Sequence, residues 1–299
     1  MRAFILSEMR MKSEMQKNKT EICKLCGNYM TPHYKAKGFL ICKCSHCSFE
    51  QVKMDSYAER FEYEASYFDN SKYRDLTALR HEHKRRISIL KKYATSDSKV
   101  VDYGCATGEF VEYACKEFDI SGCDVSEDAI RIAQEKYPTI SEKFSLVDNF
   151  LNESDQYDMV TLWDVLKHIE YPLNMTIQLS EKVKEGGYLI LSTPNIGSLF
   201  ARIMKSYWPF MTPPEHLVFF TKRSMAYLAK KAGFDICEWY ARGKWANVGF
   251  ILYKFNRVSR IKIPRGIVNL FTKGWLAKLR VYVPTHDIQY VVMKKRDNN

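Results

Sequence analysis

The sequence predicts an α/β fold with a mostly parallel sheet, preceded by a small cysteine-rich module. Two observations support this fold class. A short apolar run, a glycine-containing turn, a helix and a second short strand follow one another between Lys99 and Asp124. Ahead of them, four cysteines form two C-x2-C pairs separated by seventeen residues. Alternation of strand and helix is typical of parallel sheets with crossover helices, and 299 residues suffice to bury such a core beside a small accessory module.

The two cysteine pairs have the spacing of a four-ligand zinc site. Two thiolates three residues apart lie on one tight turn, and two such turns complete a tetrahedron around the ion. Gly27 suits the left-handed turn after the first pair, and residues 34–42 would form the hairpin between the pairs. Cys42 and His46 are alternative ligands, and free buried thiols are the other interpretation. We expect a zinc ribbon over residues 21–54 with a closed, structural zinc on Cys23, Cys26, Cys44 and Cys47.

The composition is that of a globular protein. Hydrophobic residues make up 46% and charged residues 27%, and no apolar run approaches the roughly 18–20 residues of a membrane span. The other cysteines are scattered, which favours a reducing compartment and a cytoplasmic location. Residues 1–20 have the composition of a polar tail, and residues 55–98 that of a helical connector with a lid at 63–73. We expect the His81-x-His83 pair of the connector on the solvated surface.

The net charge of +11 is concentrated in one segment. Residues 242–280 contain ten Lys or Arg and no Asp or Glu, so the other 260 residues carry about +1. This segment lies between the last two predicted strands, at 235–240 and 287–293. As helices, residues 248–261 and 266–280 would form a basic amphipathic pair, which is typical of interfacial membrane binders. A peripheral position at the inner face of an anionic membrane is therefore one expectation, and a helical cap or a homo-oligomer interface is the alternative.

The turn after the first strand is suited to a ligand that approaches the backbone. Gly104 ends the apolar run and Gly108 opens the next helix. Glycines permit close approach and leave the N–H groups at the helix start available for a ligand. Asp124 ends the next strand about twenty residues later, where a carboxylate can accept two hydrogen bonds from a ribose diol. The pattern predicts a nucleoside-binding unit.

Asp102 precedes the first glycine and Ala106 lies between the two glycines, so the turn is not the dinucleotide fingerprint. It resembles motif I of the class I S-adenosylmethionine (SAM)-dependent methyltransferases, although an ordinary turn of another Rossmann-like fold is the alternative. The resemblance implies a Rossmann-like methyltransferase domain over residues 99–299, with a seven-stranded, mostly parallel sheet whose last strand is antiparallel. It places the cofactor at Asp102, Gly104, Cys105, Gly108, Asp124, Val125, Asp148, Asn149 and Trp163.

Later segments extend the resemblance. Asp148 follows a third strand, where an acid of this family contacts the adenine amino group. After a fourth strand at 157–163, His168 ends a Val-Leu-Lys-His sequence in which Lys167 replaces the family's frequent glutamate. The Pro-Pro-Glu-His-Leu stretch that contains His216 resembles methyltransferases that act on sugars, quinone precursors and cell-envelope intermediates. His216 is thus the first choice as general base and His168 the second; alternatively, His216 only fixes its loop.

These features lead us to expect methyl transfer from SAM to a small or lipid-linked acceptor, with a sugar or cell-envelope glycan intermediate as the first choice. One alternative is an rRNA or tRNA methyltransferase whose ribbon and basic segment bind phosphates. The Asn/Asp-Pro-Pro-aromatic signature of base N-methylation is absent after the fourth strand, which makes nucleic acid the weaker choice. The other alternative is a non-catalytic zinc-ribbon binding module, against which the complete glycine turn and its two acids argue.

Overall fold

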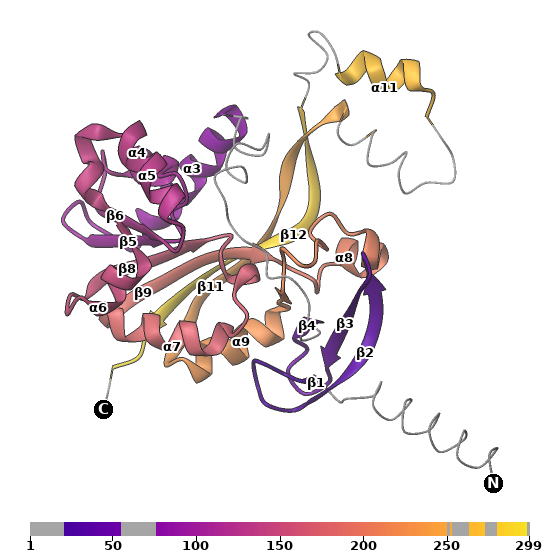
Figure 1. The fold of residues 1–299 in the computed structure, drawn as a ribbon, viewed down its shortest axis with the longest axis horizontal. Helices are drawn as coiled ribbons and strands as arrows, with labels where there is room; N and C mark the ends of the chain where they lie inside the picture. The colour runs from indigo at the N-terminus through magenta and orange to yellow at the C-terminus, as the bar shows by residue number, and fades with distance from the viewer. Residues whose placement is uncertain (1–20, 55–75, 250–251, 253–262, 273–279, 298–299) are drawn as a thin grey trace, which may run out of the picture.

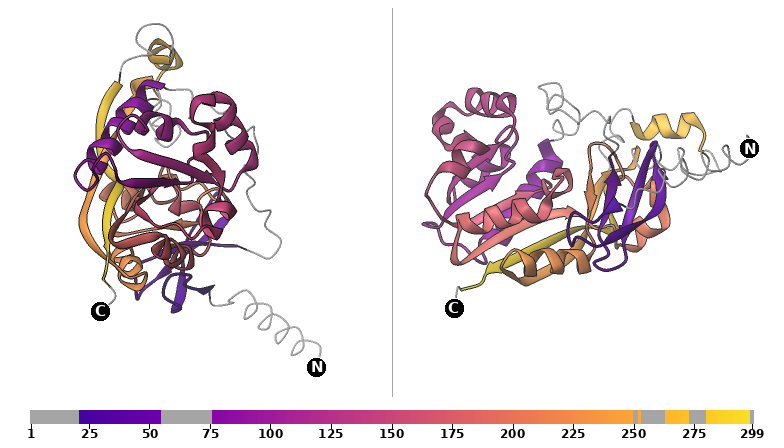
Figure 2. Two further views of the ribbon diagram at one scale, coloured as in Figure 1. Left: turned by 90° about the vertical axis from the view of Figure 1, so that its left-hand side faces the viewer. Right: turned by 60° about the horizontal axis from the view of Figure 1, so that its bottom comes forward.

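The computed structural model describes residues 21–54, 76–249, 252, 263–272 and 280–297 (Figure 1). A large sheet with helices on both faces forms the body of the molecule. A small antiparallel sheet built mainly from the N-terminal segment lies at one end of that body, and two further views show the same arrangement (Figure 2).

The large sheet has seven strands in the order β11-β12-β9-β8-β5-β6-β7. β12 pairs antiparallel with both β9 and β11, whereas the pairs from β9 to β7 are parallel. This confirms the predicted sheet with its antiparallel last strand. The strands are β5 (Lys99–Tyr103), β6 (Asp119–Asp124), β7 (Phe144–Leu146), β8 (Tyr157–Trp163), β9 (Val183–Pro194), β11 (Phe234–Asn247) and β12 (Arg280–Lys295).

Helices cover the sheet because each presents an apolar face to it. One core lies under α6, α7 and α9, and a second lies under α3, α4 and α5. Ser126 caps α5 by accepting a hydrogen bond from the Ala129 N–H, and Thr221 with Ser224 forms a capping box on α9. The α-helices are α3 (Leu76–Leu90), α4 (Glu109–Ala114), α5 (Glu127–Lys136), α6 (Val147–Asn152), α7 (Pro172–Lys182), α8 (Leu199–Met204), α9 (Lys222–Lys231) and α11 (Arg265–Thr272). Short 3-10 turns are η1 (Pro138–Lys143), η2 (Leu166–His168) and η3 (Lys205–Tyr207).

The small sheet has five strands in the order β1-β2-β3-β4-β10. Its first four strands come from the cysteine-rich segment, and β2 and β3 form the hairpin expected between the cysteine pairs. The fifth strand, β10, comes from the segment between β9 and α9 of the large domain. The strands are β1 (Glu21–Ile22), β2 (Tyr29–Ala36), β3 (Phe39–Cys44), β4 (Glu50–Lys53) and β10 (Val218–Phe219).

The two strands that flank the basic segment extend further into it than the sequence predicts. β11 and β12 continue as an antiparallel arm that projects from the large sheet as far as the pairing of Asn247 with Arg280 (Figure 1). The Val281-Tyr282-Val283 run explains this, because β-branched and aromatic residues favour strands. α11 begins one residue before the second predicted helix and covers its first seven residues, whereas residues 250–251, 253–262 and 273–279 are outside the described residues.

The prediction that His83 lies on the solvated surface is wrong. Its side chain is only 5% exposed and lies between the rings of Phe110 and Tyr113, with both centroids 5.6 Å away. Burial outweighs the polarity of the ring because α3 turns this face onto α4. The predicted tail at 1–20 and lid at 63–73 fall outside the described part of the chain.

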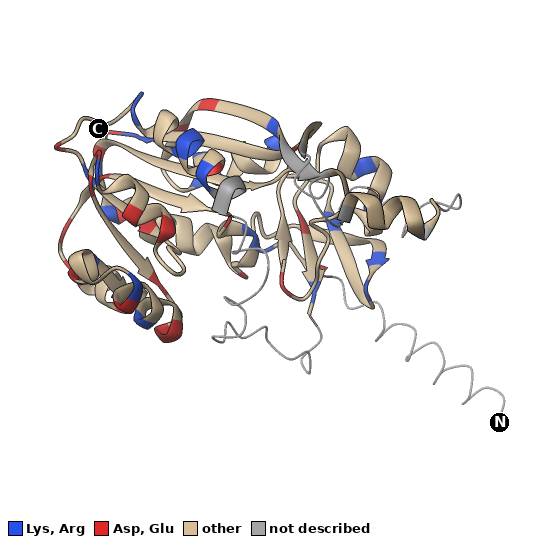
Figure 3. Cartoon of the chain, turned by 90° about the horizontal axis from the view of Figure 1, so that it is seen from above, with Lys and Arg blue, Asp and Glu red and all other residues tan. Residues whose placement is uncertain are grey.

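Charged residues of both signs are distributed over the described part of the chain. Lys and Arg positions and Asp and Glu positions are interspersed over the α/β domain (Figure 3). Within the described residues, none of the helices combines the length and apolar character needed to cross a membrane.

Candidate active site

The glycine turn lies at the carboxyl end of β5, where β6 and β8 flank it on either side. In parallel sheets, ligands bind at such a reversal of strand order. Gly104 and Gly108 have φ angles of 78° and 81°, a left-handed conformation that favours glycine. A Cβ on Gly104 would lie 2.4 Å from Cγ2 of Val165, and one on Gly108 would lie 2.7 Å from the Phe144 ring. Both positions therefore need glycine for backbone shape and for space.

Asp102 lies buried at the base of this turn, with 3% of its surface exposed. Its Oδ1 accepts a hydrogen bond of 2.7 Å from the Thr161 hydroxyl on β8. Burial raises the pKa of Asp102 to about 7, although Thr161 and the nearby Arg86 oppose the shift. A cationic ligand beside this carboxyl group would favour its ionised form.

Asp124 ties the turn to the next helix. Its two oxygens accept hydrogen bonds from the backbone N–H groups of Ala106 (2.9 Å) and Ser126 (3.0 Å). Burial raises the pKa of Asp124, and the backbone N–H donors counteract that rise. The neighbouring Val125 side chain is 64% exposed beside it. Asp124 thus sets the shape of the turn at the place where the sequence predicts a ribose contact.

The remaining predicted cofactor residues lie around the same edge. Asp148 and Asn149 are exposed in the first turn of α6, which begins directly after β7. Trp163, at the end of β8, is 6% exposed, and its Nε1 has no hydrogen-bond partner among the described residues. Cys105 is buried against the backbone of Gly122, where a Cβ would lie 2.7 Å from Cβ of Cys105. Burial raises the pKa of the Cys105 thiol. The structure therefore brings all of the predicted cofactor residues to the carboxyl ends of the parallel strands.

Arg86 on α3 is a residue that the sequence reasoning missed. Its guanidinium lies over the Trp163 ring at 5.1 Å and over the Phe110 ring at 5.6 Å, and Nη2 is 3.6 Å from Asp164 Oδ2. The Arg86 side chain is only 13% exposed. Its Nε lies 3.9 Å from Glu82 Oε1 and has no hydrogen-bond partner among the described residues. The only sequence signal was a run of basic residues in the connector, which usually marks a solvated helix face.

The two predicted catalytic histidines lie together. The ring centroids of His168 and His216 are 5.0 Å apart in an edge-on arrangement. His168 Nδ1 pairs with the Glu215 carbonyl at 2.7 Å, and His216 Nδ1 pairs with the Phe210 carbonyl at 2.6 Å. A carbonyl only accepts, so each Nδ1 carries the proton and the basic lone pair of each ring is on Nε2.

The surroundings of the two rings differ. Burial, with Lys167 nearby, lowers the pKa of His168 to about 4, so this ring is neutral near pH 7. Beside His216 Nε2, the Glu215 carboxylate lies at 4.0 Å, where it would stabilise an imidazolium. Ligand atoms of His168, Glu215 and His216 all lie within 4.8 Å of one another.

Lys167, which departs from the family's frequent glutamate, neutralises a neighbouring acid. Its Nζ is 3.1 Å from Asp164 Oδ1. Burial acts to raise the pKa of Asp164, but Lys167 and Arg86 together lower it below its ordinary value. Asp164 is therefore a carboxylate with two cationic neighbours at the end of β8.

The four predicted zinc ligands converge. Sγ of Cys23 is 3.6 Å from Sγ of Cys47, and Sγ of Cys26 is 3.5 Å from Sγ of Cys44. Zn–S bonds of about 2.3 Å in a tetrahedron place sulfurs about 3.8 Å apart, so the cluster fits this ion. The alternatives Cys42 and His46 are not part of the cluster.

Both cysteine pairs have the same backbone geometry. Cys23 and Cys44 each donate N–H to a carbonyl five residues later and accept from an N–H four residues later, at 2.8–2.9 Å. Gly27 and Ser48, which follow the two pairs, have φ angles of 74° and 63°. The Asn28 amide also donates to Cys26 Sγ at 3.4 Å. These are two matched turns that present sulfur to one point.

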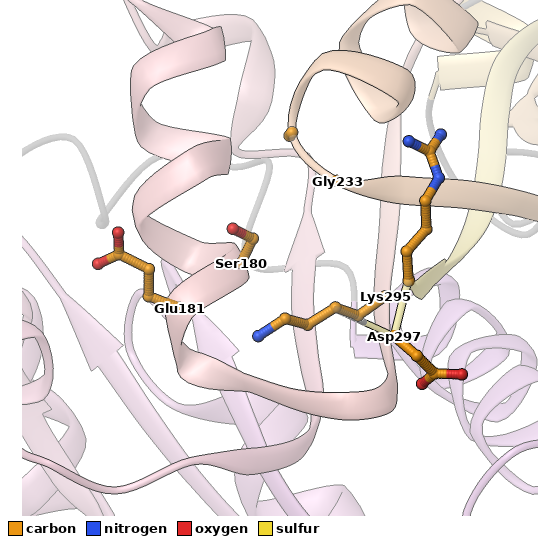
Figure 4. A pocket seen from close by; sticks show the side chains of 7 residues that line it. Ser180, Glu181, Gly233, Lys295 and Asp297 are labelled. Carbon is orange, nitrogen blue, oxygen red and sulfur yellow. The ribbon is translucent and has the colours of Figure 1, made fainter. Parts of the chain in front are cut away.

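A surface hollow of about 430 Å³ lies elsewhere, between the end of α7 and the end of β12 (Figure 4). Of the labelled residues, Ser180 and Glu181 lie on α7, Lys295 ends β12 and Asp297 follows it. Lys295 Nζ donates to the Val183 carbonyl at 2.7 Å. This hollow is therefore separate from the candidate active site.

Comparison with known proteins agrees with this geometry. A family model described as "Methyltransferase domain" matches residues 72–238, more than half of the chain. The ubiquinone biosynthesis O-methyltransferase of Candida albicans, a mitochondrial protein, is 32% identical over 120 residues, which are 37% of this chain and 36% of that protein. The protein of the same name from Nitrosospira multiformis is 26% identical over 166 residues, 51% of this chain and 70% of that one. The chain thus spans about a third of the length of the Candida relative.

Solved structures support the fold. The YcgJ protein of Bacillus subtilis gives a TM-score of 0.51 at 10% identity, covering 73% of this chain and 100% of that one. A chain from the complex of the Haloferax volcanii Trm112 methyltransferase activator with a methyltransferase gives 0.53 at 13% identity, covering 79% and 100%. The family match and the curated relatives agree with the glycine turn at the sheet's carboxyl edge. The chain belongs to the methyltransferase-domain family and has a Rossmann-like methyltransferase fold.

Proposed function

We propose that this protein transfers the methyl group of SAM to a hydroxyl oxygen of a small or lipid-linked acceptor, with His216 as general base. The observation that carries the proposal is the pairing of His168 and His216, each oriented through Nδ1 by a backbone carbonyl. His168 follows the end of β8, which borders the glycine turn. The proposed base and the glycine turn thus lie at the carboxyl ends of two neighbouring strands.

The cofactor would be held by groups from several strands. In this proposal Asp124 accepts the ribose hydroxyls, and Asp148 with Asn149 lies beside the adenine. Arg86 is the cation for the methionine carboxylate, because its guanidinium is largely buried beside Trp163. The indole N–H of Trp163 is a buried donor without a hydrogen-bond partner among the described residues, and Nε of Arg86 has only the Glu82 carboxylate, 3.9 Å away. An anionic ligand would satisfy both donors.

The reaction requires little beyond alignment and deprotonation, because the sulfonium is already an activated donor. The acceptor O–H proton passes to Nε2 of His216 while the oxygen attacks the methyl carbon and the carbon–sulfur bond breaks. S-adenosylhomocysteine leaves as a neutral thioether. The Glu215 carboxylate, 4.0 Å from Nε2, stabilises the imidazolium that forms.

The names of the relatives favour an oxygen acceptor. Those described above are named O-methyltransferases of ubiquinone biosynthesis, which supports a hydroxylated small molecule. The sugar or cell-envelope glycan acceptor expected from the sequence has no support from these relatives and rests on the Pro-Pro-Glu-His-Leu stretch alone. We therefore place a phenolic hydroxyl first and a sugar hydroxyl second.

Two further parts of the chain have proposed roles. The four-cysteine cluster is a structural zinc site, as its sulfur spacing supports. An anionic membrane surface is the proposed partner of the basic segment, because Ile267 and Leu270 on α11 are 47% and 56% exposed. Co-sedimentation with phosphatidylglycerol vesicles that weakens with salt would support this role. Salt-independent dimerisation without vesicle binding would indicate an oligomer interface instead.

The function is tested by methyl transfer from labelled SAM to panels of catechols, sugar derivatives and RNA. We expect transfer to a hydroxylated small molecule, and His216→Ala should lower turnover by about 10²–10⁴-fold while SAM affinity is kept. Unchanged turnover in His216→Ala would remove this residue as base. Transfer to RNA alone would contradict the proposed acceptor class.

A further inference from the structure

The cysteine-rich sheet is completed by the segment that carries His216. β10 pairs antiparallel with β4, so that Val218 lies opposite Gln51 and Phe219 opposite Glu50. The ladder continues one residue toward His216, because the Val52 N–H donates to the Leu217 carbonyl at 2.8 Å. The edge strand of the ribbon thus fixes the backbone immediately after the proposed base.

On its other side, the segment that carries His216 is hydrogen-bonded to η2, the 3-10 turn that contains His168. The Leu217 N–H donates to the Lys167 carbonyl at 2.8 Å, and the Glu215 carbonyl pairs with His168 Nδ1 at 2.7 Å. Residues 215–217 therefore lie between β4 of the ribbon and η2 of the large domain. The distance between the His168 and His216 rings therefore depends on the hydrogen bonds that join β4, residues 215–217 and η2.

Packing reinforces the contact. Phe49 and Phe220 are both fully buried, with ring centroids 5.0 Å apart in an edge-on arrangement. A separate apolar cluster joins the ribbon to the segment between β9 and α9; its buried members include Ile41, Val52, Trp208, Met211 and Phe219. Residues from both units form one core, so the ribbon cannot shift without moving the segment that holds His216.

Both cysteine turns are fastened to β4 or to the residue that precedes it. The Cys44 N–H donates to the Phe49 carbonyl at 2.8 Å, which places the second turn directly behind the Phe49–Phe220 contact. The first turn bonds to Gln51, because the Lys24 N–H donates to its Oε1 at 3.0 Å. The Gln51 amide, 1% exposed, also donates to Glu21 and to the Ile22 carbonyl. A metal that joins the two turns therefore fixes the start of β4 at two neighbouring points.

We infer that the zinc ribbon is a positioning element for the acceptor side of the active site. The tetrathiolate metal, when bound, supplies rigidity and no reactive ligand; β4 transmits that rigidity to β10, and β10 holds His216 against His168. This inference rests on the proposed base role of His216. The cofactor side is held separately, since Asp124 is bonded to the N–H groups of Ala106 and Ser126.

The test compares the zinc-loaded protein with the variant Phe49→Leu, which retains all four cysteines. Amide hydrogen exchange across 215–220 should accelerate about 10-fold or more in the variant, while exchange across 104–108 stays unchanged. Zinc content should remain at one equivalent. The acceptor KM should rise or kcat fall several-fold, while calorimetry shows SAM affinity within twofold of wild type. Tyr29→Leu, at a ribbon position 72% exposed, is the matched control and should change none of these.

The second experiment removes zinc from the full-length protein with a chelator. Exchange across 215–220 should again accelerate while exchange across 104–108 stays unchanged, and restoring zinc should reverse the effect. Unchanged exchange across 215–220 in both arms would overturn the inference. Equal acceleration across 104–108, with loss of SAM binding, would also overturn it, because the ribbon would then support the whole fold. The exchange measurement needs no turnover, so it remains decisive if the proposed reaction is wrong.

Discussion

Substituting Gly104 tests whether the turn geometry is as tight as described. In Gly104→Ala, the new methyl meets two separate penalties. A φ of 78° costs an L-residue about 1–2 kcal/mol. The Cβ would also lie 2.4 Å from Val165 Cγ2, and such an overlap in a packed site typically adds about 1–3 kcal/mol. The sum is about 2–5 kcal/mol of lost unfolding free energy.

Gly233→Ala is the matched control. Gly233 has a φ of 82°, and a Cβ there would meet nothing within 4 Å, so only the backbone penalty of about 1–2 kcal/mol applies. Urea unfolding of both variants isolates the overlap as their difference, about 1–3 kcal/mol. The SAM affinity should fall in Gly104→Ala alone. Equal destabilisation of the two variants would refute the tight contact between the turn and Val165.

Three further predictions concern the charges around the turn. Burial raises the pKa of Asp102 from 3.8 to about 7, so between these pH values the folded protein holds a proton that the unfolded chain releases. At about 1.36 kcal/mol per pKa unit, this group should cost the ligand-free protein up to about 4 kcal/mol of unfolding free energy as pH rises from about 4 to 7. The variant Asp102→Asn should not show this loss when its unfolding free energy is measured with urea at each pH. If the unfolding free energies of wild type and variant changed with pH in parallel, the raised pKa would be contradicted. Arg86→Met should weaken SAM binding in calorimetry by about 10–100-fold, as expected for a lost charged hydrogen bond, whereas the exposed Arg131→Met should not; equal affinities would exclude the carboxylate contact. Finally, because the pKa of His168 is lowered to about 4, this residue should not cause a fall of kcat with decreasing pH at values above pH 5. Such a fall should therefore persist in His168→Gln, and its loss in that variant would identify His168 as the base.

The sequence was sufficient for those parts of the fold that local chemistry specifies. The glycine turn, the two acids near it and the paired cysteines each have a spacing that only a few structures satisfy. The seven-stranded sheet follows because strand, turn and helix alternate along the chain. The convergence of Cys23 with Cys47, far apart in sequence, was predictable because four thiolates at this spacing suit one tetrahedral ion.

Long-range packing accounts for what was missed. His83 and Arg86 lie in a basic run whose local pattern indicates a solvated helix, and only the docking of α3 against Phe110 and Trp163 buries them. The pairing of β10 with β4 was equally hidden, because a two-residue strand has no periodicity to detect. The length of the strand arm was also missed: β11 continues to Asn247 and β12 begins at Arg280, whereas the sequence indicated strands only at 235–240 and 287–293. Pairing between segments far apart in the chain leaves little local signal.

The most direct test of the central claim is calorimetric titration of the purified protein with SAM, performed on wild type, Asp124→Asn and Asp128→Asn. We expect one bound SAM in wild type and binding at least about 10-fold weaker in Asp124→Asn, since hydrogen bonds to a charged group contribute about 1.5–3 kcal/mol. Asp128→Asn, on the surface of α5, should bind as wild type does. A folded wild-type protein that binds no SAM, or an Asp124→Asn variant with unchanged affinity, would contradict the claim that this turn and this carboxylate hold the cofactor.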